Sequence, residues 1–161
     1  MIDNQHIEYI FTDTMRLSTF SDYCLRVLMY LGAQPERRAT IAEIATAHGI
    51  SENHLMKVVH QLGRAGFIET VRGKGGGMRL ARAPKEVGIG EVLRQTETDF
   101  ALAECLGGGS ACRIESACQL RTVLDEALAA MFLVLDAYTL ADLLGAPAGT
   151  EKTIRWVTGA E

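Results

Sequence analysis

The stretch from Thr40 to Arg64, TIAEIATAHGISENHLMKVVHQLGR, decides the fold of this chain. Thr40 and Glu43 have the spacing of a capping box, which predicts the start of a helix. His48-Gly49-Ile50 is typical of a turn, and Ser51 is a good N-cap for a second helix. The core side of that second helix is expected to consist of Leu55, Val58, Val59 and Leu62. Two short helices joined by a glycine-containing turn indicate a helix-turn-helix.

After this stretch the pattern changes from helical to strand-like. Residues 67–72 and 78–81 flank a Gly-Lys-Gly-Gly-Gly tip at residues 73–77, which predicts a β-hairpin with a flexible tip. A hairpin directly after the second helix is typical of the wing of a winged helix. The tip lacks the Walker pattern and the strand–loop–helix context of a phosphate-binding loop.

The basic side chains of the chain gather in the same region. Residues 51–82 carry a net charge of +4, whereas residues 1–50 carry −2 and residues 83–161 carry −6. A basic segment inside an acidic chain indicates a surface for nucleic-acid phosphates; a solvated charged face on a generic helical hairpin is the alternative. The residues expected to contact DNA are Ser51, Asn53, His54, Lys57, His60, Arg64, Arg72, Lys74 and Arg79.

A first helix is expected from about Thr19 to Gly32, with Ser18 as its N-cap. Its core face should consist of Phe20, Cys24, Val27, Leu28 and Leu31, so Cys24 is expected to be a buried apolar residue. Asp22 faces away from that core, either as an acid favoured by the helix dipole or as a carboxylate offered to a partner. Arg26, one turn further on, shares this face and can hold the carboxylate in place.

The other three cysteines lie close together in the sequence. Cys105, Cys112 and Cys118 are separated by six and then five residues, and glycines at 107–109 allow the loop to turn its thiols toward one point. An odd number of cysteines and the absence of a secretory signal disfavour a disulfide framework. Zinc sites favour closer pairs, whereas longer gaps suit an iron–sulfur cluster. The spacing leaves three alternatives: an iron–sulfur cluster, zinc, or metal-free redox thiols.

The C-terminal part is expected to be helical. A short helix over residues 87–96 leads to the cysteine loop, and a long helix is predicted from Gln119 to Leu144. The apolar surface of this long helix is too broad for one side of a small domain, so a second copy of the chain is expected to cover it. Its apolar side chains are Leu120, Val123, Leu124, Leu128, Met131, Phe132, Leu135, Tyr138 and Leu143.

The predicted fold class is mainly α with a small β-hairpin wing, as a winged helix-turn-helix domain plus a long dimerisation helix. We expect the chain to divide into an N-terminal extension (1–14), the winged helix-turn-helix (15–98), the cysteine loop (99–118), the dimerisation helix (119–144) and a C-terminal tail (145–161).

Composition and motifs exclude several classes of function. The longest uncharged apolar run of the C-terminal half, residues 127–135, is too short for a membrane span. Without a basic and apolar leader either, we expect a cytoplasmic protein with no membrane partner. The chain shows no nucleophile–base pair, no pair of catalytic carboxylates and no GxSxG elbow, so we do not expect an enzyme.

From Met15 to about Leu144 the sequence resembles the Rrf2 family of dimeric winged-helix transcription regulators, and within the family its nitric-oxide-sensing branch. The resemblance covers about four-fifths of the chain. Besides the cysteine loop, it is carried by residues 15–26, 65–68, 72–81 and 135–143.

The resemblance implies a 4Fe–4S cluster bound by Cys105, Cys112, Cys118 and Asp22 of the partner subunit, with Arg26 beside that carboxylate. A 2Fe–2S cluster is disfavoured, because Arg121 occupies the position of a histidine in the iron–sulfur-homeostasis branch. The resemblance further implies a homodimer that binds an inverted-repeat operator in double-stranded DNA. This homodimer would repress nitric-oxide detoxification genes until nitric oxide causes it to leave the operator. The alternatives are an iron–sulfur-homeostasis or general redox regulator of the same family, or a metal-free thiol redox sensor.

Overall fold

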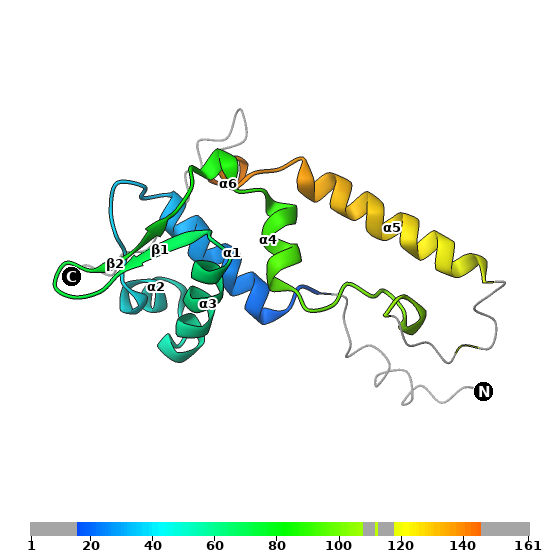
Figure 1. Cartoon of the computed structure of the whole chain (residues 1–161), viewed down its shortest axis with the longest axis horizontal. Coiled ribbons are helices and arrows are strands. Elements are labelled where there is room, and N and C mark those ends of the chain that lie inside the picture. The colour runs from blue at the N-terminus through cyan, green and yellow to red at the C-terminus, as the bar shows by residue number, and fades with distance from the viewer. Residues whose placement is uncertain (1–15, 108–111, 113–117, 146–161) are drawn as a thin grey trace, which may run out of the picture.

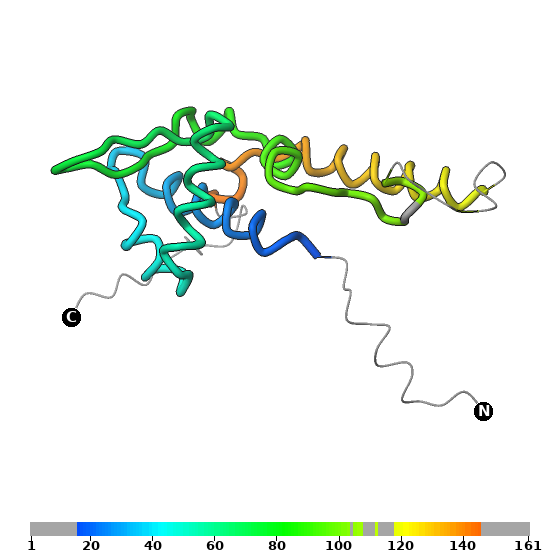
Figure 2. Tube along the Cα trace, turned by 60° about the horizontal axis from the view of Figure 1, so that its bottom comes forward, coloured from blue at the N-terminus to red at the C-terminus, as the bar shows by residue number. Residues whose placement is uncertain are grey.

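The computed structural model of this chain describes residues 16–107, 112 and 118–145 (Figure 1). The predicted extension at 1–14 and, apart from Gly145, the predicted tail lie outside these residues. The elements in chain order are α1 (Thr19–Gly32), α2 (Ile41–His48), α3 (Glu52–Arg64), β1 (Ile68–Val71), β2 (Gly77–Leu80), η1 (Pro84–Glu86), α4 (Ile89–Thr96), η2 (Glu104–Leu106), α5 (Gln119–Asp136) and α6 (Leu140–Leu144). The wing and the N-terminal end of α5 lie at opposite ends of the molecule (Figure 2). The mainly helical fold with a two-stranded wing is confirmed.

Helix α1 has the predicted bounds and supplies the centre of the core. The Ser18 hydroxyl accepts a hydrogen bond from the Ser21 N–H at 3.1 Å and so caps the helix. Cys24 is fully buried, and burial, followed by the charge of Glu97, raises the pKa of its thiol to about 12. Cys24 is therefore a protonated core residue, as predicted. The other predicted core residues Val27, Leu28 and Leu31 are buried, and Phe20 packs partly buried against them.

Helices α2 and α3 form the predicted helix-turn-helix. The Thr40 hydroxyl accepts from the Glu43 N–H at 3.2 Å, and the Glu43 carboxylate accepts from the Thr40 N–H at 3.1 Å, which completes the capping box. Gly49, with φ of 64°, ends α2 in the left-handed conformation that glycine adopts without strain. Ser51 caps α3. Leu55, Val58 and Leu62 of α3 are fully buried against α1 and α2.

Strands β1 and β2 form the antiparallel hairpin of the wing, with Ile68 opposite Leu80 and Val71 opposite Gly77. Along the outer edge of β2, Ala39 exchanges two backbone hydrogen bonds with Met78, of 2.9 and 2.8 Å. These hydrogen bonds hold the segment before α2 against the wing. Phe67 and Met78, at the inner side of the hairpin, are buried in the common core.

The single long helix predicted from Gln119 to Leu144 is wrong in one respect. The structure divides it into α5, which ends at Asp136, and α6, which begins at Leu140. The intervening backbone pairs with the segment before α4: the Ile89 N–H donates to the Tyr138 carbonyl (2.9 Å), and the Leu140 N–H donates to the Val87 carbonyl (2.8 Å). This pairing between distant segments overrides the helical periodicity and returns α6 to the core. Among the helices of the described residues, none has the length and apolar character that a membrane span needs.

Candidate nucleic-acid interface and metal site

The exposed side of α3 carries a polar and basic strip. Asn53, Lys57, His60 and Arg64 follow one another at intervals of four, three and four residues, and all are exposed. This spacing aligns their side chains along one face of the helix. His54 lies toward α1 instead, with its ring centroid 6.2 Å from that of Tyr23. The sequence placed all five in one interface, and the structure aligns four of them.

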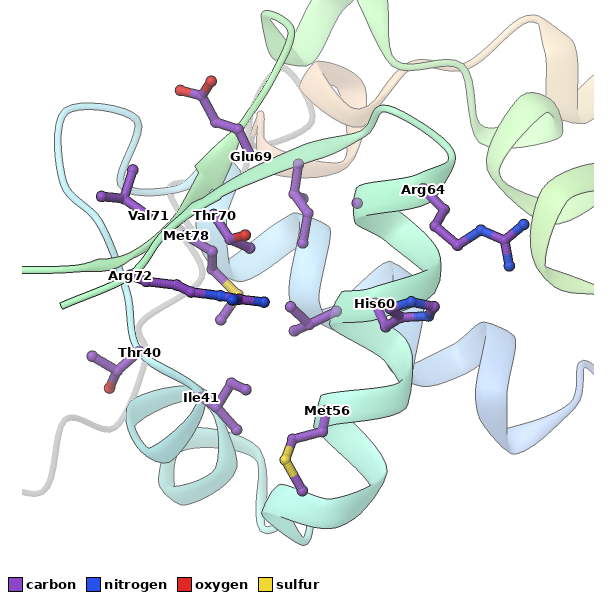
Figure 3. A pocket seen from close by; sticks show the side chains of 14 residues that line it. Thr40, Ile41, Met56, His60, Arg64, Glu69, Thr70, Val71, Arg72 and Met78 are labelled. Carbon is purple, nitrogen blue, oxygen red and sulfur yellow. The ribbon is translucent and has the colours of Figure 1, made fainter.

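An open groove of about 940 Å³ separates this strip from the wing. Its floor is apolar, because Met78 of β2 is buried beneath it and Ile41 and Met56 line its lower end. Figure 3 shows the Arg72 side chain reaching from the wing across the groove toward His60. Arg72 and His60, which line this groove, can contact a phosphate of a duplex that passes along it.

The tip of the wing is basic and rich in glycine. Arg72 and Lys74 are exposed there, and Gly73 and Gly75 adopt φ angles of 95° and 75°. Arg79 differs from them, because it forms an ion pair with Glu69, which is directly opposite in the hairpin register. Among the predicted wing contacts, Arg72 and Lys74 offer charges that no carboxylate within the described residues neutralises.

The three clustered cysteines lie between the winged helix and α5. Cys105 lies in η2 and is half-buried, Cys112 is exposed, and Cys118 is the half-buried residue that precedes α5. All three thiols are free of disulfides. Residues 108–111 and 113–117 of this loop lie outside the described part. Within the described residues, no three potential metal ligands of a single chain come together.

Asp22, the predicted fourth ligand, lies on the outward side of α1. Its carboxylate oxygen is 2.9 Å from the Arg26 guanidinium, and both side chains are a little under half exposed. The predicted pairing of these two residues on one face of the helix is confirmed. The carboxylate is therefore oriented on a surface that a second molecule can reach.

The sequence did not reveal the contact between α4 and α5, which we call the α4–α5 joint. The Arg94 guanidinium donates to both carboxylate oxygens of Asp136, at 2.6 and 2.7 Å, and lies 4.1 Å from the centre of the Phe132 ring. This hydrogen bonding lowers the pKa of Asp136. A Cβ on Gly90 would lie only 2.0 Å from the Asp136 carboxylate. Because α5 contains no buried residue, its position depends on this joint, on the adjacent backbone pairing and on the edge-on contact of Phe132 with Phe100, whose ring centroids lie 4.8 Å apart.

The outer side of α5 is apolar and exposed. Leu120, Val123, Met131 and Val134 are 60%, 57%, 37% and 58% exposed. With Ala127 they recur at intervals of three and four residues, which is the spacing of a helix–helix seam. We call these five residues the α5 stripe.

These elements together define a class of protein. A helix-turn-helix with a polar and basic strip on its second helix, next to a basic wing, is the architecture of a DNA-binding transcription regulator. Residues 17–146 match the Rrf2 family, described as "Iron-dependent Transcriptional regulator", and the chain belongs to this family. It is a DNA-binding regulator and not an enzyme, as predicted.

Relatives and solved structures agree with this assignment. The HTH-type transcriptional regulator NsrR of Geobacillus kaustophilus is 52% identical over 132 residues, which are 81% of this chain and 90% of the relative. The structure of CymR (YrzC), the global cysteine regulator of B. subtilis, is similar with a TM-score of 0.66 and 26% identity, covering 81% of this chain and 96% of that one. T. potens IscR is similar with a TM-score of 0.67 and 26% identity, covering 86% and 93%.

Proposed function

We propose that the protein is a homodimeric repressor that senses nitric oxide through a 4Fe–4S cluster and then releases an inverted-repeat operator. The observation that carries this proposal is the combination of three cysteines without disulfides in the loop before α5 with a partly exposed carboxylate on α1. The iron-dependent family and the relatives that bear the name NsrR support the same function.

The donor set suits such a cluster. Cys105, Cys112 and Cys118 supply three soft thiolates, which is the ligand type that iron–sulfur clusters require. Asp22 of the partner subunit would supply the fourth ligand, and Arg26 would hold its carboxylate in place. When bound, the cluster supplies iron atoms that react with nitric oxide. A carboxylate is a hard ligand for iron, so Asp22 would be the weakest of the four ligands.

The proposed dimer forms through the α5 stripe. The stripe of each subunit packs against the stripe of the other, so that both apolar faces are covered. Cys118 directly precedes α5, so the cysteine loop of one subunit is attached to the dimerisation helix. A bond from this loop to Asp22 of the partner subunit would tie the dimerisation helix of one chain to α1 of the other.

This tie would act on DNA through geometry. Helix α1 packs directly against α3, so the position of Asp22 determines where the strip on α3 lies. A dimer binds two half-sites only if its two recognition helices have the matching separation. Release of Asp22 would remove that constraint. A hundredfold loss of operator affinity requires only about 2.7 kcal/mol.

The proposal is tested by anaerobic absorption spectroscopy and native mass spectrometry before and after nitric oxide is added, with operator binding measured in parallel. We expect a dimer with a 4Fe–4S mass on each subunit, and loss of both this mass and operator affinity with nitric oxide. A colourless protein that binds the operator equally with and without nitric oxide would contradict the sensor but not the winged helix.

The α4–α5 joint yields a separate prediction. Arg94→Ala should leave the fold intact and lower operator affinity about tenfold, because α5 would no longer be held at a fixed angle to the winged helix. The measurement is fluorescence anisotropy on operators whose half-sites are moved together or apart by one base pair. We expect a weaker preference for the native spacing, partial restoration by the exchanged pair Arg94→Asp with Asp136→Arg, and no effect of the exposed control Lys85→Ala. An unchanged spacing preference in Arg94→Ala would show that the joint does not position α5.

A further inference from the structure

We propose that the loop between α1 and α2 forms a second phosphate-binding edge of the DNA interface, in which Arg38 contacts the outer strand of the minor groove that the wing enters. This inference rests on the proposed function as a DNA-binding repressor. It assumes that α3, as the second helix of the helix-turn-helix, enters the major groove and that the wing lies beside it. It adds to that binding mode a residue that lies before the helix-turn-helix.

This phosphate-binding edge contains a surface cavity of about 570 Å³ between the loop and the tip of the wing. We call this cavity the hollow. In Figure 1 the loop leaves α1 above the hairpin and crosses it to reach α2. Ala39 of the loop pairs with β2, whereas α3 packs against β1. The hollow is therefore separate from the groove that Arg72 spans. It is lined by Glu36, Arg37, Arg38, Gly75, Gly76 and Arg79.

The hollow is fixed in position, because the loop is fastened to the wing. Ala39 and Met78 exchange two backbone hydrogen bonds, of 2.9 and 2.8 Å. Gly77 adopts a φ of 145°, and a Cβ there would lie 2.8 Å from the Ala39 carbonyl and 3.1 Å from the Cβ of Arg38. This close approach requires glycine. Arg38 therefore keeps a fixed position relative to the wing when the wing binds DNA.

Arg38 is the available positive charge of this hollow. Arg37 is already paired with Glu43 and donates to the Gln34 side chain at 2.8 Å, and Arg79 is paired with Glu69. Arg38 is exposed, and no carboxylate of the described residues forms a salt bridge with it.

The opposite side of the hollow is formed by glycine. Gly75 and Gly76 carry no side chain, so a phosphate can approach their backbone closely. The hollow therefore offers one unpaired guanidinium next to a surface without steric obstruction, which suits a phosphate of the DNA backbone.

If α3 enters the major groove, the geometry of B-DNA would bring a phosphate strand close to Arg38. The major groove, about 12 Å wide, admits a helix such as α3, and the adjacent minor groove is about 6 Å wide. A wing inserted into the minor groove has one phosphate strand on each side. The inner strand would pass between α3 and the wing, where Arg72 crosses the groove (Figure 3). The outer strand would pass the other side of the wing, where Arg38 lies.

The test is the salt dependence of DNA binding by the full-length dimer. Arg38→Ala should weaken binding about three- to tenfold at equal salt, to operator and unrelated duplexes alike, and should lower the slope of log K against log salt by about 0.9 per subunit. Arg38→Lys should keep the slope. Glu36→Gln, which removes the carboxylate that lines the hollow, should strengthen binding. With Arg38→Ala, ethylation of the outer-strand phosphates that Arg38 is proposed to contact should no longer interfere with binding. Interference at all other phosphates should stay the same.

The controls separate this inference from the binding mode on which it rests. Lys57→Ala on α3 and Arg72→Ala on the wing should both weaken binding, and Lys85→Ala should not. An unchanged salt slope in Arg38→Ala, while Lys57→Ala and Arg72→Ala lose affinity, would overturn the role of Arg38 alone. A loss restricted to the operator sequence would also overturn it, because a phosphate contact carries no base specificity. Unchanged binding in all three variants would overturn the docking mode, and the inference with it.

Discussion

Val134→Glu is expected to convert the protein into monomers and to lower operator affinity at least about a hundredfold. Val134 lies near the end of the α5 stripe and is 58% exposed in the single chain. In the proposed dimer, the substituted carboxylate would be buried against a second apolar stripe without a partner charge, which is strongly unfavourable. A monomer offers one recognition helix to a two-half-site operator. It therefore loses the binding energy of the second half-site.

Sedimentation equilibrium checks the mass, and anisotropy on a full operator and on a half-site checks the affinity. Thr122→Glu is the matched control, because it introduces the same charge at an exposed position of α5 that is not part of the stripe. The control should stay dimeric with unchanged affinity. A dimeric Val134→Glu protein would show that α5 is not the dimer interface. A monomer that binds the full operator normally would show that dimerisation is not needed for binding.

The elements that the sequence predicted well are those specified by neighbouring residues. The Ser18 cap and the apolar spacing of α1 gave its bounds, and the capping box at Thr40 with Ser51 gave the helix-turn-helix. Caps, turns and helical periodicity are local interactions, so their signal lies within a few residues of the sequence. Burial of Cys24 followed from the same periodicity.

The features that the sequence did not reveal depend on distant residues. The break between α5 and α6 arises because Tyr138 and Leu140 pair with the backbone at 87–89, about fifty residues earlier. Arg94 and Asp136 are 42 positions apart. Arg79 looked like a free cation until the hairpin register placed Glu69 opposite it. Neither periodicity nor local charge encodes such pairs.

The proposed metal site could be predicted from the sequence only in part, for a different reason. Residue type and spacing single out the cysteines as candidate ligands, and helical geometry places Asp22 on the outside of α1. The proposed site is shared between two copies of the chain, so one chain cannot bring all four donors together. The ligand set therefore stays a prediction that ligand substitution must test.

Cys118→Ser is expected to abolish both the cluster and the response to nitric oxide. A serine hydroxyl is a hard and poorly ionised donor that replaces a soft thiolate. Cys118 is also the residue that connects the loop to α5, so its substitution would remove the proposed ligand that lies nearest to α5. Protein isolated anaerobically should contain almost no iron or sulfide and should be colourless. Its operator binding should be the same with and without nitric oxide.

Cys24→Ala is the matched control for this experiment. It removes the cysteine that the core buries and should retain the full iron content and the response to nitric oxide. Its expected cost is about 1 kcal/mol in the free energy of unfolding, which thermal denaturation can measure. A Cys118→Ser protein with the iron content of the wild type would exclude Cys118 as a ligand.

Asp22→Ala should give an intermediate result that distinguishes the carboxylate from the thiolates. The three cysteines remain to hold the cluster, so the variant should stay folded, dimeric and brown, with an altered absorption spectrum and a weaker dependence of operator binding on the cluster. Arg26, freed from its 2.9 Å contact, would remain on the same surface of α1 without a carboxylate to hold. If the spectrum and the nitric-oxide response matched those of the wild type, Asp22 would not be a ligand, and the tie between the subunits would have to involve another residue.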